Sequence, residues 1–210
     1  MELPSRAMKL YFAPRTHSTR PRWLLEELEV PYELVRLDLS KQENRTPDYL
    51  AVSPLGEVPA LVDGEVTLLV PSAICLYLAD RFPEKQLAPP LGSPERGAYY
   101  QWLLFAEATL APVVMSFHEH AQLPEEQKTA AHAQEALARH HARLGALLDV
   151  VAAEVEDRDF LAAGRFTAAD LVMASILHLA NHLKLLEDRP RLVKYIYLHC
   201  QRPASRRAVS

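Results

Sequence analysis

The sequence lacks several features that mark particular classes of protein. It has only two cysteines, Cys75 and Cys200, which lie far apart and form no Cys-x-x-Cys motif. Neither a disulfide framework nor a dithiol redox site is therefore expected, and such cysteine usage is typical of a reducing cytosol. There is also no run of about 18 or more apolar residues, so no membrane-spanning helix is expected.

Excess positive charge and targeting signals are lacking too. The formal net charge is −4, whereas a nucleic-acid footprint would be basic. The first residues, MELPSRAM, have no signal-peptide apolar region, and we expect the fold to begin near Met8. These absences predict a cytoplasmic protein that binds neither nucleic acid nor membrane. What the chain does have is 49% hydrophobic residues over 210 positions, enough for one large domain or two small ones.

The most informative stretch runs from Glu57 to Phe82 (EVPALVDGEVTLLVPSAICLYLADRF). A Val58-Pro59 step opens it, and two short apolar runs follow with Asp63-Gly64 between them. Asp-Gly in that position predicts a β-hairpin, because glycine takes positive φ without a steric penalty.

Ser72 opens a helical pattern directly after the hairpin. Serine is a good N-cap residue, so we expect the helix to begin there. Helix N-termini present unpaired backbone N–H groups and favour negative charge, so such a position can bind a carboxylate or phosphate.

The rest of the chain divides in two. Before the hairpin, the pattern predicts a strand at 9–13, a helix to Leu28, a strand at 32–39 and a short helix from Pro47, with Thr46 as its N-cap, to about Val52. With the hairpin and the helix that follows it, the order is βαβαββα. After it, only helical patterns remain: 94–120, 124–155, a capping box of Thr167 and Asp170 with Phe166 as the staple, and 192–201. We therefore predict an α/β domain over 8–86, a linker at 87–92 and an all-α domain over 93–210.

The segments Val58-Pro59-Ala60-Leu61 and Ser72-Ala73-Ile74-x-x-Tyr77-Leu78, with the hairpin between them, resemble the glutathione-binding half of the cytosolic glutathione transferases. The resemblance covers nearly the whole chain. It implies a thioredoxin-like first domain, a C-terminal helical bundle, glutathione as co-substrate and a homodimer. It also implies that Pro59 is cis, that the Val58 backbone pairs with the cysteinyl part of glutathione, and that Ser72 takes the γ-glutamyl carboxylate.

In this family, catalysis means stabilising the glutathione thiolate, since a free thiol is mostly protonated at neutral pH. The loop after the first strand provides that group, and in this chain it offers Thr16, His17, Ser18 and Thr19. In bacterial members with cysteine, the register Pro-x-x-Cys-Ser falls on Pro14 to Ser18, so His17 occupies the cysteine position. Our interpretation is that Ser18 donates a hydrogen bond to the thiolate, with His17 second and Tyr11 third. Alternatively, Ser18 only caps the first helix.

Three further positions follow from the resemblance. Pro71 stands where most members carry Glu or Gln for the γ-glutamyl amine, so one charge-assisted hydrogen bond, worth roughly 1.5–3 kcal/mol, would be missing. Lys41 is expected to bind the glycine carboxylate of glutathione, with Arg45 as the alternative. Glu57 is expected to touch the ligand backbone.

No metal site is expected. His178 and His182 stand four apart on one helical face, but no third ligand has the spacing of a zinc motif.

The leading hypothesis from the resemblance is conjugation of glutathione to small apolar electrophiles. A glutathione-dependent peroxidase or disulfide reductase is the second hypothesis. The third, which Pro71 favours, is a non-catalytic transferase-like binding protein.

Overall fold

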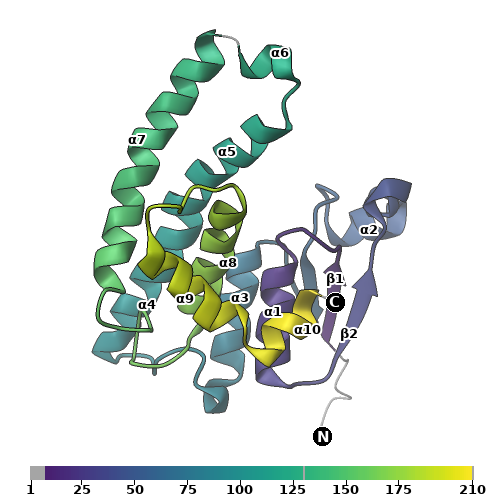
Figure 1. Ribbon diagram of the computed structural model, residues 1–210. Coiled ribbons are helices and arrows are strands. Elements are labelled where there is room, and N and C mark those ends of the chain that lie inside the picture. Colours follow the sequence, from purple (N-terminus) through teal and green to yellow (C-terminus); the bar gives the residue numbers. More distant parts are fainter. Residues whose placement is uncertain (1–7, 130, 210) are drawn as a thin grey trace, which may run out of the picture. The chain divides into compact units, whose positions relative to one another are not determined.

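The computed structural model describes residues 8–129 and 131–209 (Figure 1). The described chain forms two compact units, one made of the residues up to Ala88 and from Gln201 onward, the other of Pro89–Cys200. The boundary after Ala88 falls within the predicted linker, 87–92. The C-terminal boundary differs from the prediction of a helical domain over 93–210, because the end of the chain packs against the first unit.

The first unit is built on a sheet of β1 (Met8–Phe12), β2 (Tyr32–Arg36), β3 (Ala60–Asp63) and β4 (Val66–Leu68). Within the described residues its four strands have the order β2-β1-β3-β4. The central β1 pairs parallel with β2 and antiparallel with β3. The predicted hairpin joins β3 and β4, and Gly64 in its turn has φ +61°.

Helices α1 (Thr19–Leu28) and α3 (Pro71–Arg81) pack against each other on one side of this sheet, and α2 (Pro47–Val52) lies apart from them (Figure 1). Leu10 of β1, Leu24 of α1 and Ile74 of α3 are fully buried. The chain between β1 and β2 crosses over through α1, which is the usual way to join parallel strands. The thioredoxin-like order βαβαββα is thus confirmed.

Two elements of this unit differ from the prediction. The second strand ends at Arg36, not Leu39, and the chain turns through two 3₁₀ segments, η1 (Leu39–Lys41) and η2 (Glu43–Arg45). Helix α3 begins at Pro71 with Val70 as its N-cap, so Ser72 is the second helical residue. Proline is favoured at the first helical position because its missing N–H has no helical partner there.

A last helix, α10 (Pro203–Val209), was not predicted. Two ion pairs fasten its segment to α1: Arg202 contacts both carboxylate oxygens of Glu27, at 2.6 and 2.8 Å, and Arg207 Nε lies 2.6 Å from a carboxylate oxygen of Glu26. These contacts explain why the C-terminus belongs to the first unit.

The second unit is helical. The pattern at 94–120 forms α4 (Pro94–Leu104), a π-helical stretch η4 (Phe105–Leu110) and α5 (Ala111–Gln122), and the pattern at 124–155 forms α6 (Glu125–Lys128) and α7 (Ala131–Glu154). Helix α8 (Ala168–His182) has ten of its 15 residues buried and packs against α4, α5 and α9 (Pro190–Cys200).

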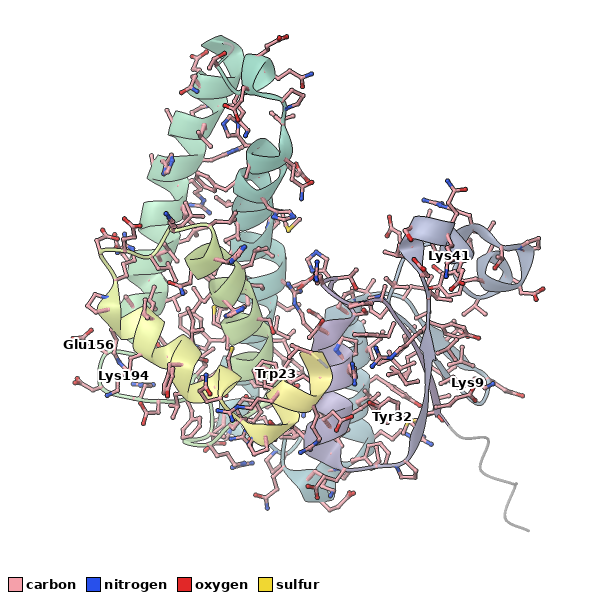
Figure 2. All side chains as sticks on the ribbon, turned by 45° about the vertical axis from the view of Figure 1, so that its right-hand side comes forward. Lys9, Trp23, Tyr32, Lys41, Glu156 and Lys194 are labelled. Carbon is pink, nitrogen blue, oxygen red and sulfur yellow. The ribbon has the colours of Figure 1, made fainter. Side chains whose placement is uncertain are left out.

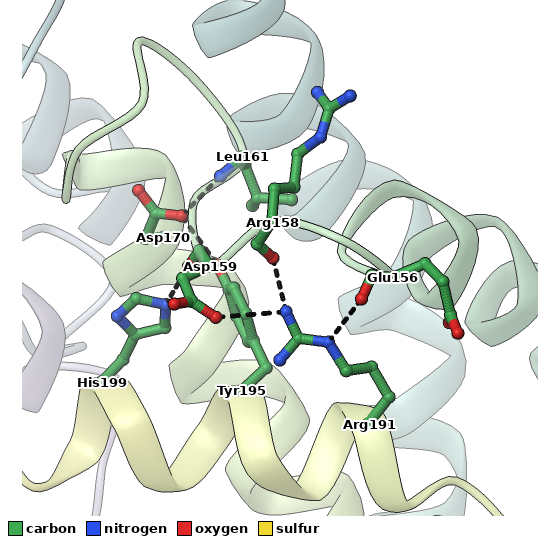
Figure 3. A network of polar contacts seen from close by, with 8 residues as sticks. All are labelled: Glu156, Arg158, Asp159, Leu161, Asp170, Arg191, Tyr195 and His199. Atoms are coloured by element: carbon green, nitrogen blue, oxygen red, sulfur yellow. Dashed lines mark hydrogen bonds and ion pairs between the residues drawn. The ribbon is translucent and has the colours of Figure 1, made fainter.

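The predicted capping box at the start of α8 is confirmed. The carboxylate of Asp170 accepts a hydrogen bond from the backbone N–H of Thr167 at 2.9 Å. It also accepts from the backbone N–H of Leu161 and from the Tyr195 hydroxyl, both at 2.8 Å (Figure 3). Arg191 on α9 holds the loop before this helix: it donates to the Asp159 carboxylate and to the backbone carbonyls of residues 156 and 158 (Figure 3). Burial raises the pKa of Asp170 to about 6 despite these donors.

Candidate functional site

A pocket of about 370 Å³ lies in the first unit. Its lining comes from the loop after β1, from η1 and η2, and from the turn before β3. The lining residues are Thr16, His17, Leu39, Asn44, Arg45, Gly56, Glu57 and Val58. Segments separated by as many as 42 positions are brought together because β1 and β3 are paired neighbours and the 3₁₀ segments follow β2.

The loop after β1 is closed by two hydroxyl groups. The Ser18 hydroxyl accepts the Ala13 N–H at 3.1 Å and lies 2.9 Å from the Ala13 carbonyl oxygen. The Thr16 hydroxyl lies 2.7 Å from the same carbonyl and 2.6 Å from the Ser18 hydroxyl. Ser18 is fully buried and its side chain makes no cap bond to α1. Its hydroxyl therefore serves the loop, whereas its neighbour His17 lines the pocket.

Gly56 allows the turn before β3 to approach η2 closely. Its φ is +63°, and a Cβ atom there would lie 2.7 Å from the carbonyl oxygen of Asn44. Only glycine adopts this backbone conformation readily and leaves that space empty. The turn leads to Val58, and the peptide bond from Val58 to Pro59 is cis, as the resemblance implies. The β1–β3 ladder begins only at Ala60, so the peptide groups of Val58 lie outside it.

The two candidate cations are placed differently. The Lys41 side chain is 72% exposed and its ammonium lies 3.1 Å from the Asp38 carboxylate, outside the pocket lining (Figure 2). Arg45 lines the pocket, and its guanidinium donates to the Leu55 carbonyl oxygen at 2.9 Å. The structure thus brings Arg45 to the site in place of Lys41.

Of the predicted catalytic residues, His17 lines the pocket and Ser18 does not. Of the predicted glutathione-binding residues, Glu57 and Val58 line the pocket, while Ser18, Lys41, Pro59, Pro71 and Ser72 are outside its lining. Ser72 is 4% exposed near the start of α3. Sequence reasoning missed Leu39, Asn44 and Gly56. Gly56 could have been found, because a glycine just before the Val-Pro step is a signal for a tight turn. No sequence pattern marked Leu39 or Asn44.

The described residues contain no group of three or more His, Cys, Asp or Glu placed to hold a metal ion. Partial burial and the nearby His182 lower the pKa of His178. None of the helices in the described part of the chain has the length and apolarity needed to cross a membrane.

The fold and the site define a class of protein: a thioredoxin-like unit with a ligand-sized pocket at its cis-proline corner, combined in one chain with a helical unit. Comparison with known proteins makes this class specific. Two family models match, one described as the N-terminal domain of glutathione S-transferase over residues 6–80, the other as its C-terminal domain over residues 134–196.

The chain is similar over nearly its whole length to individual members. It is 32% identical over 206 residues to glutathione S-transferase GstA of Escherichia coli O157:H7, covering 97% of this chain and 98% of that one. A glutathione transferase structure from Methylococcus capsulatus str. Bath has 30% identity, a TM-score of 0.81 and 97% coverage of both chains. A sphingomonad glutathione S-transferase complexed with glutathione has 29% identity, a TM-score of 0.79 and 96% coverage of both. The chain therefore belongs to the glutathione S-transferase family.

Proposed function

We propose that this protein is a transferase that binds glutathione in the pocket of its first unit and joins the glutathione sulfur to the electrophilic carbon of small apolar substrates. The thiol proton and the substrate's leaving group are released as the new sulfur–carbon bond forms. The observation that carries the proposal is the pocket of about 370 Å³ lined together by His17, Arg45 and Val58. These residues offer an imidazole, a cation and peptide groups outside the sheet ladder, which suit a thiol, a carboxylate and a peptide backbone.

His17 is proposed as the residue that faces the sulfur. An imidazole N–H aimed at the sulfur favours the thiolate, which is the nucleophile, over the thiol. Ser18, the first choice from sequence, is proposed to act through His17: its buried hydroxyl holds Ala13 and the loop. The role of Ser72 at the γ-glutamyl carboxylate stays a prediction, as does the missing contact at Pro71.

Arg45 is proposed to bind a carboxylate of glutathione. A guanidinium presents a planar set of donors that matches a carboxylate. Its bond to the Leu55 carbonyl holds part of that set in place and leaves further N–H groups to the pocket. A homodimer working in the cytoplasm completes the proposal: the dimer rests on the resemblance, and the location rests on the sparse cysteine usage.

The test is a conjugation assay with chlorodinitrobenzene and glutathione. The wild type should turn over, His17→Ala should lose most of kcat/KM, and Ser18→Ala should lose less at a temperature where both remain folded. Turnover of an organic hydroperoxide or a small disulfide in place of conjugation would replace this proposal with the peroxidase or reductase hypothesis. Absence of any glutathione-dependent activity would favour the binding-protein hypothesis.

A further inference from the structure

Three consecutive carbonyl groups before the Val-Pro step each accept a hydrogen bond from a side chain of the segment 44–53. The Leu55 carbonyl accepts from Arg45 at 2.9 Å, and the Gly56 carbonyl accepts from the Asn44 amide at 2.7 Å. The Glu57 carbonyl accepts from the hydroxyls of Tyr49 and Ser53. Side chains are one of the ways in which backbone groups outside regular secondary structure are paired. Because Gly56 and Glu57 line the pocket, this set of bonds fixes one wall of it.

Glu57 is held most firmly. Its carbonyl oxygen accepts from the Tyr49 hydroxyl at 2.6 Å and from the Ser53 hydroxyl at 3.0 Å, and its N–H lies 3.3 Å from the Ser53 oxygen. Both donors are buried, Tyr49 at 3% and Ser53 at 1% exposed. Burial raises the pKa of Tyr49 to about 12, so its hydroxyl keeps its proton at neutral pH.

The peptide group between Glu57 and Val58 links the fixed Glu57 carbonyl to the Val58 N–H. Among the described residues only the Val58–Pro59 bond is cis, so this preceding one is trans. A trans peptide group is planar, with its C=O and N–H on opposite edges. Holding the Glu57 oxygen toward α2 therefore directs the Val58 N–H away from α2, and Val58 lines the pocket.

We propose that Tyr49 is a positioning residue for the peptide part of the ligand: with Ser53 it fixes the Glu57 carbonyl and so orients the Val58 N–H for a peptide carbonyl. This rests on the proposed function for the ligand's identity. Tyr49 and Ser53 do not line the pocket, and they act through Glu57. Their removal should weaken glutathione binding while leaving the step at the sulfur intact.

The experiment compares Tyr49→Phe and Tyr49→Phe/Ser53→Ala with wild type and with a control, Tyr32→Phe. Tyr32 is a fitting control because its hydroxyl also donates one bond, to Glu26 at 2.7 Å, and burial raises its pKa to about 12 as well. Its partner in β1 is Met8, at the opposite end of that strand from the pocket.

Two readouts are needed. Amide hydrogen exchange at residues 55–58 without ligand should accelerate roughly threefold to tenfold in Tyr49→Phe, more in the double variant, and stay unchanged in Tyr32→Phe. The KM for glutathione should rise by a similar factor, with kcat at saturation within about twofold of wild type.

Unchanged exchange at 55–58 together with an unchanged KM in the double variant would overturn the inference. So would equal effects in Tyr32→Phe, because they would reveal only general destabilisation. If exchange accelerates as expected but the wild type shows no glutathione turnover, the proposed function fails while the positioning of the Glu57–Val58 peptide by Tyr49 stands.

Discussion

The hydroxyl oxygen of Ser18 lies 2.9 Å from the carbonyl oxygen of Ala13 and accepts the N–H of that residue at 3.1 Å. One side chain thus satisfies both backbone groups of the residue that follows β1. The loop between them is pinned at its two ends, and His17 is left at the pocket.

Ser18→Ala is expected to lower the free energy of unfolding by about 1–3 kcal/mol, since the buried Ala13 groups lose a partner. The pKa of the glutathione thiol bound to the folded variant should stay close to the value in the wild type. Urea denaturation measures the first quantity, and thiolate absorbance against pH measures the second. A stability unchanged by the substitution would contradict the structural role.

His17→Ala should show the reverse. Its unfolding free energy should fall by less than that of Ser18→Ala, because the His17 side chain is only half-buried whereas Ser18 is fully buried. The pKa of the bound thiol should rise by about one unit, which corresponds to a hydrogen bond of about 1.4 kcal/mol to the anion. A bound-thiol pKa that moves in Ser18→Ala but not in His17→Ala would reverse the assignment.

Arg45→Gln is expected to raise the KM for glutathione roughly tenfold to a hundredfold, the value of a charge-assisted hydrogen bond. Arg45→Lys should give an intermediate value, because it keeps the charge and loses the planar donors. Lys41→Gln is the matched control and should change KM less than about twofold, since Lys41 faces solvent beside Asp38. Steady-state kinetics at varied glutathione concentration measures all three KM values. A larger rise in KM for Lys41→Gln than for Arg45→Gln would restore Lys41 as the residue that binds the carboxylate.

Gly56→Ala should be more destabilising than Gly64→Ala. Both glycines have positive φ, +63° and +61°, so both variants carry the left-handed backbone penalty of about 1–2 kcal/mol. Only at Gly56 would the new Cβ also meet the Asn44 carbonyl, at 2.7 Å, while the space around Gly64 is open. Chemical denaturation measures the free energy of unfolding of both variants, and the difference between them is the cost of the contact with the Asn44 carbonyl. An equal loss of stability in the two variants would show that the turn at Gly56 can relax.

Asp170 should give the second unit a pH-dependent stability. Its pKa of about 6 in the folded protein is above the ordinary value of 3.8, so folding favours its protonated form. Stability from this group is therefore present at low pH and lost as pH rises through about 6. When the pH is lowered from 7 to 4, the free energy of unfolding of the wild type should rise by about 1–3 kcal/mol relative to that of Asp170→Asn. A difference between the two proteins that does not vary with pH would contradict the raised pKa.

The local signals in the sequence were sufficient for much of the fold. The Asp63-Gly64 turn and the Thr167–Asp170 capping box were readable because each depends on residues a few positions apart. Helix α10 was not readable, because its position depends on the pairing of Arg202 with Glu27, which lie 175 positions apart.

The candidate site was predicted less completely, for the same physical reason. The register of the loop after β1 suggested both Ser18 and His17, but only packing decides which of two neighbours is buried. Likewise, Lys41 and Arg45 are both cations after β2, and the turns η1 and η2 determine that Arg45 reaches the pocket. Tyr49 carried no sequence signal for its bond to Glu57.

Calorimetric titration of the wild type with reduced glutathione tests the central claim most directly, with the His17→Ala and Arg45→Gln variants titrated alongside. The account predicts a saturable heat with one site per chain, weakened more by the change at Arg45 than by the change at His17. No heat from the wild type at millimolar glutathione would contradict it.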